Sequence, residues 1–141
     1  MMEMMCVEFE SKSENEAFAR VVAAAFIARL NPTLDEVEDV KMAISEAVTN
    51  AIVHGYENDP SKKIFMRCSI ENQTCQFRIM DQGVGIADIE RAKEPMYSTK
   101  KDEERAGMGF TFMDTLMDDL QIYSQLGEGT TIIMTKTFSR G

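Results

Sequence analysis

The fold is decided by a stretch that reads Glu46-Ala47-Val48-Thr49-Asn50-Ala51-Ile52-Val53-His54-Gly55-Tyr56. At about 100° per residue, one narrow stripe of a helix collects the apolar residues that we expect to face the core: Val40, Ile44, Ala47 and Ala51. Glu46 and Asn50 lie together on the flank of this stripe, about one turn apart. A carboxylate and a carboxamide stacked in this way can share one small cation or one water, although on most helices such a pair is simply solvated.

The composition is that of an ordinary globular chain with an acidic balance. The 141 residues allow one domain, 1–141, with 44% hydrophobic and 28% charged residues. The formal net charge of −9 argues against direct nucleic-acid binding and against an anionic membrane surface, because both need clustered Lys and Arg. The longest apolar run, 21–28, is far shorter than the roughly 20 residues that span a bilayer.

The first residues and the cysteines predict a cytoplasmic protein. The N-terminal stretch carries Glu3, Glu8 and Glu10 and lacks a basic region followed by an apolar core, so we expect no signal peptide. The three cysteines stand in no C-x-x-C spacing and are interpreted as reduced core thiols: Cys6, Cys68 and Cys75.

Apolar periodicity predicts a strand over 2–10 followed by two helices, over 14–30 and from about 34 to 54. Capping boxes are predicted for both helices, Ser13 with Glu16 and Thr33 with Glu36. The expected apolar stripe of the first helix is Phe18, Val21, Val22, Ala25, Phe26 and Leu30.

The second half of the chain predicts two hairpins separated by a long excursion. Alternating residues indicate strands over 64–70 and 75–81, and again over 120–125 and 130–138. Residues 82–106 have little periodicity, and about 87–106 are predicted to form a lid. The order indicates an α/β (α+β) two-layer sandwich, with a mixed and mainly antiparallel sheet and helices on one face.

Two glycine-bearing stretches suggest ligand contacts. Asp81-Gln82-Gly83-Val84-Gly85-Ile86 follows a strand, so the Asp81 carboxylate can fix a donor such as an exocyclic amine. Gly107-Met108-Gly109-Phe110 is predicted to precede a helix, where free N–H groups and the positive end of the helix dipole suit phosphate. Either stretch alone is compatible with a plain turn.

Absent motifs narrow the class of nucleotide site. The chain has no G-x-x-x-x-G-K-[ST], which excludes a Walker-type site, and no H-R-D or D-F-G signature of eukaryotic-type protein kinases. No G-x-G-x-x-G follows the first predicted strand, which argues against a dinucleotide-binding fold.

Taken together, these stretches resemble the sequence boxes of the Bergerat-fold ATPases, the superfamily of gyrase, histidine kinases and mismatch-repair ATPases. The run E-x-x-x-N-A from Glu46 resembles the first box, Asp81-x-Gly83-x-Gly85-Ile86 the second, Gly107-x-Gly109-Phe110 the third and Gly127-x-Gly129-Thr130 the last. The fuller runs, with His54-Gly55-Tyr56, Ser98-Thr99-Lys100 and Glu104-Arg105, resemble the anti-sigma F factor family of spore-forming bacteria. Ala106 departs from that family, where a serine is expected.

The resemblance implies an ATP/ADP site with Mg²⁺. Asn50 would hold the metal, and Glu46 would be the general base that takes the proton from an attacking serine hydroxyl. Asp81 would accept from the adenine amine, with Thr130 nearby. The backbone would lie close to the nucleotide at Gly83, Gly85 and Ile86.

The resemblance also implies the phosphate contacts and the lid residues. N–H groups of Gly107, Met108 and Gly109, next to Phe110, would meet the phosphates. Arg105 would reach the terminal phosphate with its fork of donors, although its charged run could be only a solvated loop. Thr99 and Lys100 would belong to the lid.

The implied partners are a sigma factor, which such a protein inhibits during sporulation, and an anti-anti-sigma protein phosphorylated on a serine. A homodimer is implied as well, and Arg20 on the first helix is the candidate partner contact. Three alternatives stay open: a nucleotide-dependent sigma-binding module without kinase activity, a stress-response anti-sigma kinase, and the detached ATP-binding domain of a histidine kinase.

Overall fold

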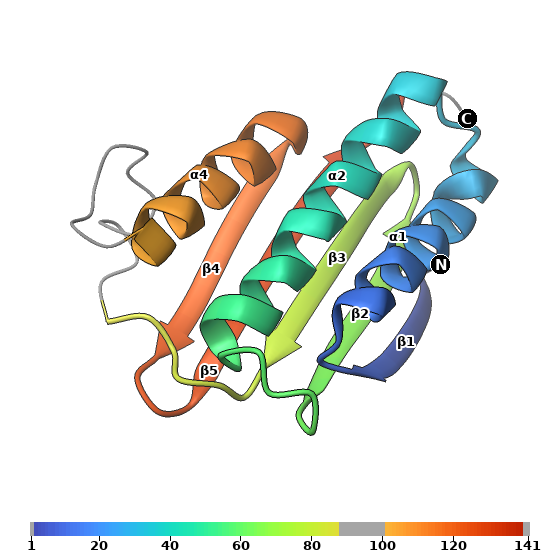
Figure 1. Ribbon diagram of the computed structural model, residues 1–141. Helices are drawn as coiled ribbons and strands as arrows, with labels where there is room; N and C mark the ends of the chain where they lie inside the picture. The colour runs from blue at the N-terminus through green and yellow to red at the C-terminus, as the bar shows by residue number, and fades with distance from the viewer. Residues whose placement is uncertain (1, 88–100, 140–141) are drawn as a thin grey trace.

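The computed structural model describes residues 2–87 and 101–139, with the side chains of 101–108 left out of that description. Its five strands form one sheet in the order β1-β2-β3-β5-β4, and every neighbouring pair is antiparallel. The bounds are β1 (Met2–Glu10), β2 (Lys63–Glu71), β3 (Thr74–Asp81), β4 (Asp119–Gln125) and β5 (Gly129–Thr137). The helices cover one face of this sheet (Figure 1), which confirms the predicted two-layer class.

The central strands bury alternate residues, as predicted for a sheet with one covered face. In β2 and β3 every second side chain is buried beneath the helices, namely Ile64, Met66, Cys68, Ile70, Cys75, Phe77 and Ile79. Asn72 turns the chain between these strands with a φ of 58°, a left-handed conformation that asparagine tolerates. Both hairpins therefore lie where the alternation predicts them.

The first helix exposes a different face from the predicted one. α1 (Ser13–Ile27) continues as a short 3₁₀ turn, η1 (Ala28–Leu30). Phe18 and Val21, expected in the core, are 67% and 63% exposed. Phe26 and Leu30 of the predicted stripe are buried as expected, and the other buried residues of this segment are Ala19, Ala23 and Ile27. Both the predicted and the buried set have helical spacing, and the small alanines of the buried set allow α1 to pack closely against α2.

Of the two predicted capping boxes, one is confirmed and one is wrong. Thr33 Oγ1 accepts from the Glu36 N–H at 3.1 Å, and Glu36 Oε1 accepts from the Thr33 N–H at 2.8 Å. At α1 the N-cap is Lys12 without a side-chain cap. Ser13 is itself the first residue of the helix, so it cannot act as the N-cap, and Glu16 instead accepts from Ser45 Oγ on α2.

The predicted long helix is built from two kinds of turn. α2 (Leu34–Asn50) is followed by a π-helical segment, η2 (Ala51–Gly55), closed by the Tyr56 N–H on the Ala51 carbonyl at 2.9 Å. The predicted core stripe of α2 is confirmed, since its members are at most 1% exposed: Val40, Ile44, Ala47 and Ala51. π-helical turns often mark functional sites, and this one begins directly after Asn50.

The last helix starts earlier than predicted. α4 (Lys101–Leu116) takes in residues 107–109, which the sequence analysis expected before a helix. Residues 101–106 are mostly strong helix formers, with acidic residues near the N-terminus, so they extend the helix. Thr99, Lys100 and most of the predicted lid over 87–106 lie outside the described residues. No helix among the described residues is long and apolar enough to cross a membrane.

Candidate functional site

Segments far apart in the sequence meet where η2 and β3 end. A methyl group on Gly55 would lie 2.8 Å from the Asp81 carboxylate, so only a glycine leaves room for it. The Gly55 carbonyl accepts from the Val84 N–H at 2.9 Å. On the other side, Asp81 pairs in register with Thr130 of β5. The end of the long helix, the loop after β3 and the start of β5 thus form one site.

Asp81 is the buried acid of this site. It is 6% exposed, and its Oδ1 accepts from the Gly83 N–H at 2.9 Å. Burial raises the pKa of Asp81 to about 6, against the opposing effect of the backbone N–H groups of Gly83 and Thr130. At neutral pH the side chain is an ionised acceptor in a dry surrounding, which suits a neutral donor such as an amine.

Glu46 lies one turn before Asn50 and against α4. Its Oε2 is 3.1 Å from the position that a methyl group on Gly109 would take. Desolvation, and secondly the charge of Glu16, raise the pKa of Glu46 above its ordinary value. A half-buried carboxylate with a raised pKa is a stronger proton acceptor, which is the property that a general base needs.

Asn50 is a buried carboxamide with an unused acceptor. It is 7% exposed, so it does not belong to a solvated surface pair. The buried Asn50 Oδ1 has no hydrogen-bond partner among the described residues. A buried oxygen without a partner is unfavourable, and a carboxamide oxygen is a ligand type that Mg²⁺ accepts together with phosphate oxygens. The residue present therefore fits a magnesium–nucleotide site.

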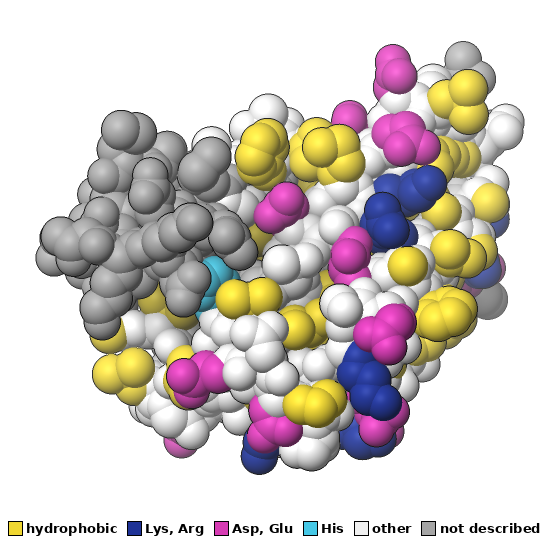
Figure 2. All heavy atoms as spheres, viewed as in Figure 1, with side chains coloured by type: hydrophobic (Ala, Val, Ile, Leu, Met, Phe, Trp, Pro, Cys, Tyr) yellow, Lys and Arg dark blue, Asp and Glu magenta, His cyan; other side chains and the backbone are white. Residues whose placement is uncertain are grey.

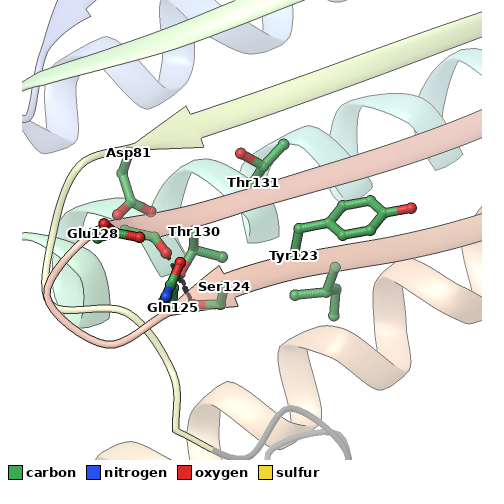
Figure 3. Close-up of a pocket in the computed structure, with 9 residues that line it drawn as sticks. Asp81, Tyr123, Ser124, Gln125, Glu128, Thr130 and Thr131 are labelled. Carbon is green, nitrogen blue, oxygen red and sulfur yellow. Dashed lines mark hydrogen bonds between the residues drawn. The ribbon is translucent and has the colours of Figure 1, made fainter.

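Two supporting residues were missed by the sequence analysis. Tyr56 is 7% exposed, and its hydroxyl accepts from the Gln82 N–H and donates to the Lys63 carbonyl, both at 2.6 Å. Ser124 lies beside Thr130 in a pocket of about 370 Å³ that also contains Asp81 (Figure 3). Tyr56 stands inside the stretch that decides the fold, whereas Ser124 has no motif of its own.

The remaining predicted residues are placed as follows. Gly83, Gly85 and Ile86 lie in the loop after β3, and Phe110 is buried in α4 beside Gly109. The backbone of Arg105, Gly107 and Met108 lies within α4, but the side chains of Arg105 and Met108 are outside the described part.

Arg20 lies apart from this site, on α1. Its side chain is 40% exposed, and its Nε is 3.2 Å from Glu16 Oε1. Hydrophobic side chains are scattered over the helical face (Figure 2), and the strongly exposed ones of α1 and α2 are Phe18, Val21, Leu34 and Met42.

Comparison with known proteins defines the class and then the family. Residues 9–136 match the family described as histidine kinase-like ATPase domain, a nucleotide-binding domain of ATP-using enzymes. The anti-sigma F factor of Clostridium beijerinckii is 52% identical over 135 residues, which span 96% of this chain and 94% of the relative. That of Anoxybacillus flavithermus is 49% identical over 136 residues, spanning 96% and 93%. The chain belongs to the anti-sigma F factor family.

Solved structures share the fold at low sequence identity. The RsbU and RsbW domains of Rv1364c from Mycobacterium tuberculosis match with a TM-score of 0.69 and 19% identity, covering 98% of this chain and 32% of that one. The catalytic domain of histidine kinase ThkA matches with a TM-score of 0.60 and 16% identity, covering 95% and 96%. At these identities the likeness concerns the fold alone.

Proposed function

We propose that the protein is a Mg-ATP-dependent protein-serine kinase that also binds and inhibits a sigma factor. The observation that carries the kinase proposal is Glu46, a half-buried carboxylate of raised pKa that lies against Gly109, one turn from the unpartnered Asn50 oxygen. Nucleotide binding alone needs no base at this position. The anti-sigma proposal is supported by the names of relatives at about 50% identity over nearly the whole chain.

In the proposed reaction, the serine oxygen of the substrate forms a bond to the terminal phosphorus while the bond to ADP breaks. Glu46 takes the hydroxyl proton, and Asn50 would hold Mg²⁺, which supplies charge neutralisation when bound. Asp81 accepts from the adenine amine, with Thr130 beside it. Arg105 is assigned to the terminal phosphate, and Thr99 with Lys100 to the lid, on the resemblance to the family.

Phosphate binding by the amides of residues 107–109 requires a change in α4. Within a helix, an N–H beyond the first four residues bonds to the carbonyl four positions earlier, so these amides are not free in this structure. Two glycines in a helix lower its stability by roughly 1 kcal/mol each, which makes this part of α4 easy to unwind. We therefore expect α4 to begin after Gly109 when nucleotide is bound.

The proposed partners are a sigma factor of sporulation and an anti-anti-sigma protein that is the kinase substrate. The exposed face of α1, with Arg20 between Phe18 and Val21, is the proposed contact. Exposed aromatic and aliphatic side chains around an arginine are typical of interface centres. A homodimer and a cytoplasmic location belong to the same proposal.

Phosphoryl transfer tests the function. The protein is incubated with Mg²⁺ and γ-labelled ATP, with and without the anti-anti-sigma protein of the same genome. Label on that protein that survives acid is expected from the wild type. Glu46→Gln should lower the rate about 10²–10⁴-fold at unchanged ATP affinity, whereas the control Glu38→Gln, an exposed glutamate of α2, should keep it.

The same experiment separates a kinase from a module that only binds. ATP binding without label on any protein would leave a nucleotide-dependent sigma-binding module.

A capture experiment with the sporulation sigma factor tests the partner surface. Arg20→Glu should weaken capture, whereas Lys62→Glu, an exposed charge reversal before β2, should not. Capture of a stress-response sigma factor instead would assign the protein to that setting.

A further inference from the structure

Ser124 joins three neighbours at the wall of the nucleotide pocket. Its Oγ accepts from the Ile86 N–H at 2.7 Å and lies 3.0 Å from the Gly129 carbonyl oxygen. The same Oγ lies 2.8 Å from Thr130 Oγ1, and Figure 3 shows these two side chains next to each other. Ser124 and Thr130 are register partners on β4 and β5. One hydroxyl thus connects the loop after β3 with both residues at the start of β5.

The number of protons fixes the direction of these hydrogen bonds. A serine hydroxyl has one hydrogen and two lone pairs. The Ile86 N–H can only donate and the Gly129 carbonyl can only accept, so the single Ser124 proton goes to Gly129. Thr130 must then donate its own proton to Ser124. All groups are satisfied by this arrangement, and Thr130 Oγ1 has only lone pairs left for a ligand.

The surroundings hold Ser124 in this position. The Gly127 N–H donates to the Val84 carbonyl at 2.8 Å, which ties the β4–β5 turn to the loop after β3. A methyl group on Gly85 would lie 2.2 Å from the Gln125 carbonyl oxygen, so the two segments are in direct backbone contact. The Ser124 hydroxyl therefore has little freedom to turn toward other partners.

We propose that Ser124 is a positioning residue that keeps Thr130 a hydrogen-bond acceptor and thereby selects a 6-aminopurine nucleotide over a 6-oxopurine nucleotide. Thr130 stands opposite Asp81 in the sheet, so the pocket presents two acceptors side by side. A 6-amino group can donate hydrogen bonds to these acceptors. A 6-oxo group is itself an acceptor, so its oxygen would face two other acceptors with no hydrogen to form a hydrogen bond. This inference rests on the nucleotide site of the proposed function.

The test compares ATP with ITP, which carries a 6-oxo group on an otherwise similar purine. Isothermal titration calorimetry gives the ratio of the two dissociation constants for wild type, Ser124→Ala and Ser124→Thr. In Ser124→Ala the Thr130 hydroxyl no longer donates to Ser124 and can donate to the 6-oxo group of ITP. The dissociation constant of ITP divided by that of ATP should therefore fall about tenfold, the effect of one hydrogen bond. Ser124→Thr retains the hydroxyl and should keep the wild-type ratio.

A merely structural role of Ser124 would weaken both nucleotides by the same factor, and an unchanged ratio in Ser124→Ala overturns the inference. If Ser124→Ala does not fold, Thr130→Val carries the test. In Thr130→Val the ratio of the ITP to the ATP dissociation constant should also fall, because the acceptor that faces the 6-oxo group is removed. An unchanged ratio in this variant would overturn the inference as well. A wild type that binds neither nucleotide would instead overturn the nucleotide site itself.

Discussion

Asp81 should lower the stability of the nucleotide-free protein, and Asp81→Asn should remove that effect. The pKa of Asp81 in the folded state, about 6, lies above its ordinary value of 3.8. The folded state therefore binds the proton more tightly than the unfolded state. Its stabilising effect is fully present below pH 3.8 and is lost as the pH rises through about 6. Asparagine keeps an acceptor for the Gly83 N–H but does not titrate.

The size of the effect follows from the two pKa values. At about 1.4 kcal/mol per pH unit, ionisation at pH 7.5 lowers the free energy of unfolding by about 3 kcal/mol relative to the protonated form. About 1 kcal/mol of this decrease in the free energy of unfolding has already occurred at pH 4.5, because Asp81 is largely ionised in the unfolded state at that pH. The stability difference between Asp81→Asn and wild type should thus grow by about 2 kcal/mol from pH 4.5 to pH 7.5.

Urea unfolding at several pH values, followed by circular dichroism without nucleotide, measures this difference. Asp59→Asn is the control, because hydrogen bonds from Ser61 lower the pKa of the exposed Asp59 and its pH trend should have the opposite sign. Calorimetry on the same Asp81→Asn sample should show loss of ATP binding. A stability difference that does not change with pH would refute the reasoning about the buried charge.

Two further predictions concern local packing. Thr33→Ala removes the capping box of α2 and should lower the free energy of unfolding by about 1 kcal/mol. The matched Ser13→Ala, whose hydroxyl caps no helix N–H, should change it by less than about 0.5 kcal/mol, and equal effects in urea unfolding would contradict the assignment. Gly55→Ala inserts a methyl group 2.8 Å from the Asp81 carboxylate; it should destabilise the protein by about 1–3 kcal/mol and weaken ATP binding in calorimetry. Wild-type affinity in Gly55→Ala would contradict the tight contact.

The strands and the core stripe of α2 could be predicted because they depend on local periodicity. Alternation in β2 and β3 and the four-residue spacing from Val40 to Ala51 are properties of the sequence alone. The exposed face of α1 could not be predicted in the same way. Phe18 and Val21 form a helical stripe as regular as that of Ala19 and Ala23, and only the packing against α2 decides between the two.

The site was predictable in its motifs and not in its connections. Asp81 stands out because an acid follows a strand and precedes two glycines, but its burial depends on Gly55 and Thr130, which reach it from other elements. Ser124 carries no local signal, since its importance arises from a register pair across β4 and β5. The start of α4 was missed because the glycines suggested a break that the preceding helix formers overcome.

Two residues of the proposed site carry groups that are unfavourable for the stability of the nucleotide-free fold. Asp81 is ionised in a buried place, and the Asn50 oxygen lacks a partner among the described residues. A π-helical segment joins these two residues in place of an ordinary helix end. One group of the proposed ligand can relieve each of them: the amine relieves the Asp81 carboxylate, and the metal relieves the Asn50 oxygen. A sequence that keeps such groups together against their effect on stability is best explained by selection for binding.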